Sequence, residues 1–257
     1  MKPATLPRRV VSLVPSLTEA LIWLGLADHL VGVSDWCVHP AEAVAKLPKL
    51  GGTKTPSIPR ILALEPELVI ANHEENRRRD VEKLEAAGVP VWVTYPRSVR
   101  EGVALLRELA ELGAAAGARP ERVDPIEAAV AAAEAVRTPR RVRTFCPIWK
   151  RPWMSVGGDT YAHDLLALCG AENVFANQGD RRYPIVAPEQ IAAAAPELIL
   201  LPDEPYAFGP RDAAELAELD VPAAASGRIH LIDGTLVSWY GPRIQRAIET
   251  LRPLIAG

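Results

Sequence analysis

The sequence has few cysteines and aromatic residues, and it lacks a long apolar run. Its cysteines, Cys37, Cys146 and Cys169, are odd in number and have neither the spacing of a disulfide framework nor that of a CxxC metal knuckle. No uninterrupted apolar stretch approaches the roughly 20 residues that a transmembrane helix needs. We therefore expect a fold that does without disulfides and is not inserted into a membrane.

An excess of positive charge is also lacking. The formal net charge is −3 at pH 7, so the chain has no basic field that would attract nucleic acid or an anionic membrane. We expect neither as a partner.

No apolar run of signal-peptide length precedes the first predicted strand, which favours a cytoplasmic location for the chain as written. A chain trimmed of its signal peptide would instead be extracytoplasmic.

Catalytic motifs are missing too. There is no GxSxG elbow, P-loop, HExxH or strand–GxGxxG–helix pattern, and we expect a protein that is not an enzyme and has no cofactor. One turn, residues 157–160 (GGDT), precedes a predicted helix. Its amides are suited to an anion, while Asp159 or Thr160 is equally suited to cap the helix.

What the sequence has is an alternation of short β-branched runs with longer amphipathic stretches, which is typical of βα units with parallel strands. Its 257 residues suit two lobes of roughly 100–130 residues each. The predicted strands are 9–13, 31–33, 68–71, 89–94, 141–145, 197–201 and 229–232. The predicted helices are 18–26, 58–64, 78–87, 160–169, 189–194 and 242–255.

Two segments look like copies of each other. Residues 58–71 (IPRILALEPELVIA) and 188–201 (PEQIAAAAPELILL) each predict a short helix, a Pro-Glu-Leu turn and a buried strand. Chance could produce this phrase in any α/β protein, but the order of the surrounding elements agrees as well. A repeat of this length indicates two related lobes rather than a solenoid.

The segment between the copies predicts helix only. Residues 120–137 are strong helix formers with apolar positions three or four apart, which favours one packed stripe on a single linking helix. We therefore predict an α/β fold of two Rossmann-like lobes with central parallel sheets, joined by one long helix, with a ligand cleft between the lobes. The predicted bounds are 1–97, 98–139 and 140–257.

Aromatic residues, although only 5% of the chain, concentrate in predicted loops. They are Trp36, Trp149, Trp153, Trp239, Tyr183, Tyr206 and Tyr240. Rigid rings at the carboxyl ends of parallel strands suit a ligand surface. The alternative is that they plug an interface between the lobes.

Two smaller groups also have binding chemistry. A thiol and an imidazole, Cys37 and His39, lie two residues apart and are weak candidates for a metal site, although a buried structural cysteine is the simpler interpretation. Arg181, Arg182 and Arg243 would suit an anionic ligand.

Several phrases resemble the helical-backbone substrate-binding proteins of ABC importers, which serve cobalamin, ferric siderophores and haem. They are VVSLVPSLTEALIWLGLADHLVGVSDW, ILALEPELVIA, LLALCGAENVF and GPRIQRAIETL, and they span about residues 9–254. CVHP, GGTK and RPWMSVGGDT resemble a subgroup whose members often carry no signal peptide.

The resemblance implies a small-molecule ligand, a corrinoid or metal chelate, and an ABC permease as partner. Together with Asp159 and Arg243, the candidate ligand-binding residues it implies are Trp36, Cys37, His73, Trp149, Trp153, Tyr183, Tyr206 and Trp239. Glu189 matches the family's permease-docking carboxylate, whereas the corresponding place in the first lobe is Pro59, followed by Arg60. The alternatives are a cytoplasmic sensing module without a permease and an enzyme that uses Cys37 and His39.

Overall fold

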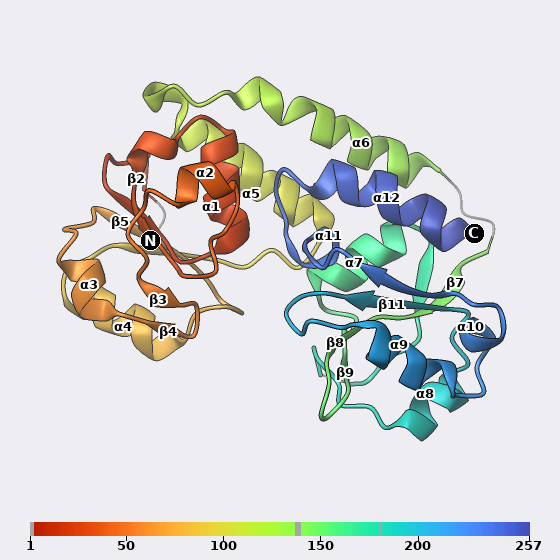
Figure 1. Ribbon diagram of the computed structural model, residues 1–257. Helices are drawn as coiled ribbons and strands as arrows, with labels where there is room; N and C mark the ends of the chain where they lie inside the picture. The colour runs from red at the N-terminus through yellow and green to blue at the C-terminus, as the bar shows by residue number, and fades with distance from the viewer. Residues whose placement is uncertain (1–2, 137–139, 180) are drawn as a thin grey trace. The chain divides into compact units, whose positions relative to one another are not determined.

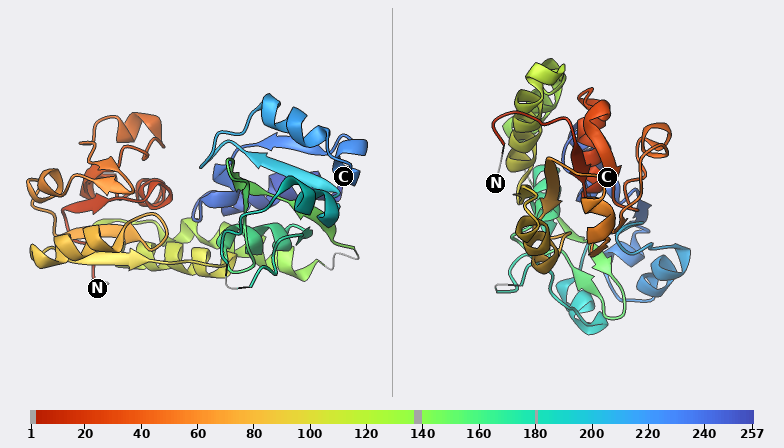
Figure 2. Two further views of the ribbon diagram at one scale, coloured as in Figure 1. Left: turned by 90° about the horizontal axis from the view of Figure 1, so that it is seen from below. Right: turned by 90° about the vertical axis from the view of Figure 1, so that its left-hand side faces the viewer.

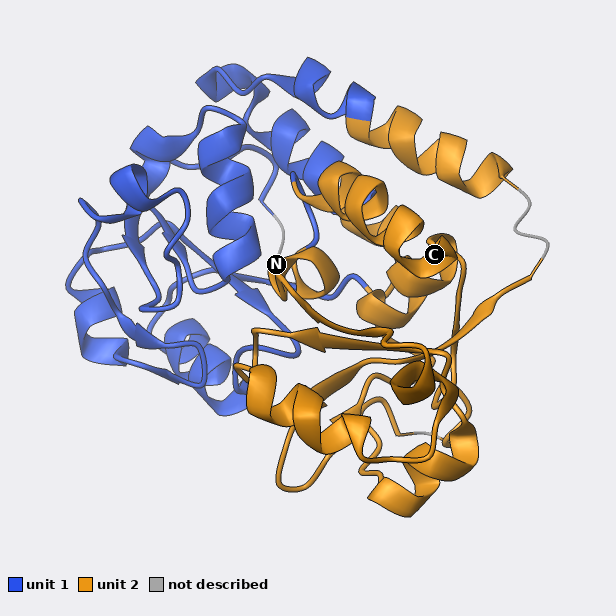
Figure 3. Ribbon diagram, turned by 45° about the vertical axis from the view of Figure 1, so that its right-hand side comes forward, with its two compact units in different colours: residues 1–96, 103–125, 240–242 blue, residues 97–102, 126–239, 243–257 orange. Residues whose placement is uncertain are grey.

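The computed structural model describes residues 3–136, 140–179 and 181–257 (Figure 1). Its internal contacts divide the chain into two compact units (Figure 3). Unit 1 comprises residues 1–96, 103–125 and 240–242, and unit 2 comprises residues 97–102, 126–239 and 243–257. Each unit is an α/β structure with its own parallel sheet, as the sequence predicts.

Unit 1 contains a four-stranded sheet in which every pairing is parallel. In spatial order its strands are β2 (Leu30–Val33), β1 (Val10–Ser12), β5 (Leu68–Asn72) and β6 (Val91–Thr94). A small antiparallel pair is formed by β3 (Gly51–Gly52) and β4 (Thr55–Pro56). The helices are α1 (Pro15–Trp23), α2 (Ala41–Val44), α3 (Ile58–Leu62) and α4 (Arg78–Ala86), with 3-10 turns at Ala27–His29, Ala114–Ala116 and Pro120–Arg122.

Unit 2 repeats the arrangement. Its parallel sheet consists, in spatial order, of β10 (Ala171–Asn173), β7 (Val142–Phe145), β11 (Leu198–Pro202) and β12 (Ile229–Ile232). An antiparallel hairpin is formed by β8 (Pro147–Trp149) and β9 (Met154–Ser155). The helices are α7 (Tyr161–Leu168), α8 (Pro188–Ala194), α9 (Pro210–Ala217), α10 (Pro222–Ala225), α11 (Thr235–Ser238) and α12 (Ile244–Ala256).

The internal repeat extends to individual hydrogen bonds. In each unit the second strand along the chain lies outside the first, and the third and fourth follow on the other side. The glutamate of each Pro-Glu-Leu turn accepts the backbone N–H at the start of the first strand: Glu67 from Arg9 at 2.9 Å and Glu197 from Arg143 at 3.2 Å. The same carboxylate contact therefore ties the third strand to the first in both units.

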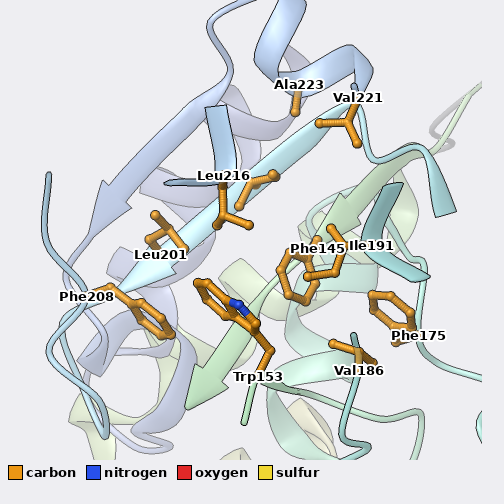
Figure 4. Close-up of a cluster of buried hydrophobic side chains, with 11 residues drawn as sticks. Phe145, Trp153, Phe175, Val186, Ile191, Leu201, Phe208, Leu216, Val221 and Ala223 are labelled. Atoms are coloured by element: carbon orange, nitrogen blue, oxygen red, sulfur yellow. The ribbon is translucent and has the colours of Figure 1, made fainter. Parts of the chain in front are cut away.

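The hydrophobic cores lie against these sheets. All five residues of β5 and of β11 are buried, as expected for central parallel strands that are covered on both faces. In unit 1 the β-strand residues Val11 and Val69 pack with Ile61 of α3 and Leu84 of α4. Figure 2 shows helices against the sheet of each unit in two further views. The core of unit 2 is richer in aromatic rings (Figure 4).

The described residues of the segment 98–139 include two helices, α5 (Val99–Leu112) and α6 (Asp124–Ala135). The linking helix predicted over residues 120–137 corresponds to the 3-10 turn Pro120–Arg122 followed by α6, and its last residue lies outside the described residues. Residues of both helices occur in both units. The predicted domain bounds and the predicted ligand cleft between the lobes stay predictions. Within the described parts of the chain, no helix is long and apolar enough to cross a membrane.

Some local predictions differ from the structure. The last helix begins at Ile244 rather than at residue 242. Trp149 ends a strand instead of lying in a loop. The short strand β10 carries a glutamate and an asparagine, and its polar sequence lacks the β-branched signal by which the other strands of the sheet are recognised.

Glu197 provides a test of the carboxylate contact, because Arg140 and the Arg143 amide donate to it and hold its pKa below the ordinary 4.5. A lowered pKa stabilises the fold above pH 4.5, and this contribution is lost as the pH falls through the pKa of the folded state. We expect E197Q to lower the free energy of unfolding by about 1 kcal/mol at pH 7 and by progressively less below pH 4.5. Urea unfolding across this pH range measures the difference.

The matched control is E218Q, which neutralises an exposed glutamate elsewhere in unit 2. It should leave the unfolding curve unchanged at every pH. A loss for E197Q that is the same at pH 3 as at pH 7 would contradict the role given to the Glu197 charge.

Candidate functional site

Small polar side chains mark the carboxyl ends of the strands in unit 1. Ser12 ends β1, Ser34 follows β2, Asn72 ends β5 and Thr94 ends β6, and all four are buried. Because parallel strands end at the same edge of a sheet, these groups and the loops after them share one edge, which is where α/β folds bind ligands. This edge is the candidate binding surface of unit 1.

Cys37 lies beneath that surface. Its Sγ is 3.1 Å from both Thr18 Oγ1 and Ser34 Oγ, and Thr18 Oγ1 donates to Ser12 Oγ at 2.8 Å. Burial raises the pKa of the Cys37 thiol despite these hydrogen bonds. The residue is 0% exposed, and its predicted ligand-binding role stays a prediction.

The metal interpretation of Cys37 and His39 finds no support in this geometry. A thiolate is the form that binds metal, and the raised pKa opposes its formation. His39 is exposed. Among residues 3–136, 140–179 and 181–257 there is no group of three or more His, Cys, Asp or Glu side chains that could hold an ion.

Exposed rings do occur at this edge. Trp36, two residues after Ser34, is 64% exposed. His73 and Tyr95 follow β5 and β6, and their ring centroids are 4.4 Å apart. Sequence reasoning selected Trp36 and His73 but missed Tyr95, whose signal is its position directly after a strand.

The loop that carries His73 is held by Asn72. Its Oδ1 accepts the Glu74 N–H at 2.7 Å, and its Nδ2 donates to the Tyr240 hydroxyl at 2.8 Å. Tyr240 was expected in a ligand-facing loop, but it is buried, and burial raises its pKa well above the ordinary value. It therefore serves as an internal support of this edge.

In unit 2 a chain of ring contacts runs from the surface to the core. Trp149, 43% exposed, packs edge-on against Tyr206 at 5.6 Å. Tyr206 contacts Phe208 at 4.6 Å, which stacks on Trp153 at 5.7 Å. Figure 4 shows Phe208 and Trp153 side by side. Trp153 is only 7% exposed, whereas Trp149 is exposed and Tyr206 is half-buried. The predicted ligand-binding roles of all three stay predictions.

Trp239 is also buried. Its Nε1 donates to Glu204 Oε1 at 2.5 Å, and the Arg243 guanidinium lies 4.7 Å above its ring. Arg243 also donates to Thr235 Oγ1 at 2.5 Å. Burial raises the pKa of Glu204 although Ser238 and Trp239 donate to it. These contacts fix the start of α12 and place Trp239 and Arg243 in a structural cluster.

The glycine turn before α7 does not present free amides. Gly157 N donates to the Arg182 carbonyl at 2.7 Å, and Gly158 N donates to the Ala176 carbonyl at 3.0 Å. Thr160 is the helix cap and accepts the His163 N–H, which confirms the capping alternative. Asp159 is exposed and pairs with Arg182 at 2.5 Å and Arg97 at 3.3 Å.

The remaining candidates lie at separate places in unit 2. Tyr183 is half-buried in the loop before α8, and Arg181 is exposed there. Glu189 is exposed in the first turn of α8. Pro59 occupies the equivalent place in α3 of unit 1 and is exposed as well. No contact of these residues tests the predicted ligand or docking roles.

Each of the two α/β units has a four-stranded parallel sheet, and exposed aromatic rings, Trp36 in unit 1 and Trp149 in unit 2, follow or end strands. The chain belongs to the periplasmic binding protein family, whose sequence pattern matches residues 10–235. The family resemblance inferred from the sequence is thereby confirmed.

Individual relatives support the assignment. The vitamin B12-binding protein of Yersinia pestis (strain Pestoides F) is 32% identical over 232 residues, which cover 87% of this chain and 79% of that protein. The periplasmic heme-binding protein RhuT from Roseiflexus sp. RS-1 is 26% identical, with a TM-score of 0.79 over 96% of this chain and 97% of its own. The vitamin B12 binding protein BtuF of Vibrio cholerae shares the fold at 24% identity, with a TM-score of 0.82 over 98% of both chains.

The environment of the cysteines predicts a low reactivity of the native protein. All three are buried, and burial raises the pKa of Cys146 and of Cys169 to about 12. We expect iodoacetamide at pH 8 to label Cys37 at least about 100-fold more slowly than a cysteine introduced by V38C, a position that is 49% exposed. Mass spectrometry of timed samples gives both rates, and urea should remove the difference. Equal rates in the native protein would contradict the buried environment of Cys37.

Proposed function

We propose that this protein binds a small corrinoid or metal chelate, of the cobalamin or haem type, through the exposed rings at the strand ends of its two units. The observation that carries the proposal is the exposure of Trp36 in unit 1 and Trp149 in unit 2, in a chain whose aromatic content is only 5%. His73 and Tyr95 add to the first surface, and Tyr206 adds to the second.

The chemistry of these surfaces fits a broad, partly apolar ring system. Tryptophan and tyrosine bury a large area and have few rotatable bonds, so they bind with a small loss of conformational entropy. Supports beneath the rings, Asn72 with Tyr240 and the stack from Tyr206 to Trp153, hold them before a ligand arrives. The vitamin B12-binding and heme-binding relatives agree with this ligand class.

Binding measurements with single-ring variants test the proposal. Binding of cyanocobalamin and of haemin is measured by absorbance titration and by the shift in melting temperature. A ligand that binds only the folded state raises that temperature. We expect W36A and W149A each to weaken binding of the accepted ligand by about tenfold or more.

The matched control is V136A, which truncates another exposed apolar side chain, 52% exposed, beyond the end of α6. It should leave the dissociation constant unchanged. If wild-type protein bound neither cyanocobalamin nor haemin, or if all three variants bound equally well, the proposed function would be wrong.

For the partner, we propose an ABC permease that contacts the exposed Glu189 of α8. The competing proposal, a cytoplasmic sensing module, is favoured by Pro59 and Arg60 at the equivalent place in α3, since a second docking carboxylate is lacking there.

Fractionation of native cells distinguishes the two proposals. Recovery from the extracytoplasmic fraction, together with a loss of ligand uptake in E189A cells, is expected for the permease partner. Recovery of full-length protein from the cytosol would contradict it and support the sensing module.

The enzymatic alternative rests on Cys37 and His39, and the environment of Cys37 argues against it. A nucleophilic cysteine has to be accessible and partly ionised, whereas Cys37 is buried with a raised pKa. We therefore propose a binding role without catalysis.

A further inference from the structure

The residue after the exposed Trp149 is a lysine whose side chain is buried. The Lys150 side chain is 8% exposed. Its Nζ donates to Asp212 Oδ1 and to Glu215 Oε2, both at 2.6 Å, from the neighbouring helix α9. A buried ammonium group is costly unless it is paired, so these carboxylates are what allow Lys150 to lie here.

The ion pair between Lys150 and Asp212 is maintained because each group favours the charged form of the other. Burial by itself lowers the pKa of Lys150, but the hydrogen bonds and charges of Asp212 and Glu215 outweigh it and leave the pKa above its ordinary value. The pKa of Asp212 is lowered, because Lys150 and the Gly209 amide outweigh the effect of burial. Both partners therefore stay charged at neutral pH.

The same lysine also lies against the aromatic core. Its Nζ is 5.0 Å from the centre of the Trp153 ring, a distance at which a cation is attracted to the face of the ring. Lys150 and Trp153 lie in the turn of the β8–β9 hairpin, whose first strand ends at Trp149. The ion pairs of Lys150 therefore hold the turn to α9, and its contact with the Trp153 ring holds the turn to the core.

We infer that Lys150 and Asp212 are positioning residues, which hold the β8–β9 hairpin on α9 so that Trp149 keeps one orientation toward the ligand. This inference rests on the proposed function only in taking Trp149 to contact a ligand. The orientation of Trp149 itself is a property of the ligand-free protein and is measured without any ligand.

Two variants separate the charge from the other roles of Asp212. D212N removes the charge, while its amide oxygen remains able to accept the Gly209 N–H that Asp212 Oδ2 accepts at 2.9 Å. It leaves Lys150 with Glu215, which is 51% exposed. K150M/D212N removes the buried charge as well, and Met keeps an aliphatic stem against Trp153.

Fluorine NMR of protein labelled with 5-fluorotryptophan follows each of the six tryptophans, and W149F identifies the resonance of Trp149. We expect that resonance to shift and broaden in D212N and to return toward its wild-type position and width in K150M/D212N. E218Q, an exposed change just after α9, should leave it unchanged. Unchanged resonances of Trp23 and Trp92 show that unit 1 keeps its fold.

Binding of cyanocobalamin and haemin to the same variants gives the second measurement. We expect the dissociation constant to rise about fivefold or more in D212N and to recover in the double variant. A Trp149 resonance that is the same in D212N and wild type would overturn the positioning role. A resonance that changes as expected, in a protein that binds neither compound, supports the positioning role and contradicts the proposed function.

Discussion

The parallel pairing of the strands is the constraint on which the rest of this structure depends. In a parallel sheet all carboxyl ends lie at one edge, so the loops that follow the strands gather there. In unit 1 this edge brings together buried Ser12, Asn72 and Thr94 with the exposed Trp36. At the opposite ends of the strands, Glu67 and Glu197 make the same contact with the first strand of each unit.

The tryptophans of the two units divide into exposed and buried residues. Trp36 and Trp149 are exposed, whereas Trp153 and Trp239 are buried and hold the surroundings in place. All three phenylalanines of the chain lie in the core of unit 2. One of them, Phe208, lies between Tyr206, which contacts the exposed Trp149, and the buried Trp153. A surface supported in this way loses little entropy when a ligand binds, and the ion pair of Lys150 adds a second support.

Much of the architecture could be predicted because it depends on local patterns. The Pro-Glu-Leu phrases predict both the repeat and the strands β5 and β11, since turn chemistry and buried apolar runs are visible in short windows.

The side chains of the candidate site are harder to predict from the sequence. A tryptophan in a loop can point outward, as Trp36 does, or inward, as Trp153 does, and its neighbours in sequence do not decide which. Lys150 pairs with Asp212, 62 residues away, and no local pattern indicates such a pair.

We propose that the exposed rings of this protein bind a corrinoid or metal chelate. The most direct test is to incubate the purified protein with an excess of cobalamin or haemin, remove free compound by gel filtration, and measure the visible spectrum and the cobalt and iron content of the protein peak. We expect a stoichiometric amount of one of these metals, with the absorbance of its ring system, to elute with the protein. A protein peak that carries neither the metal nor the absorbance would show that these rings do not bind such a ligand.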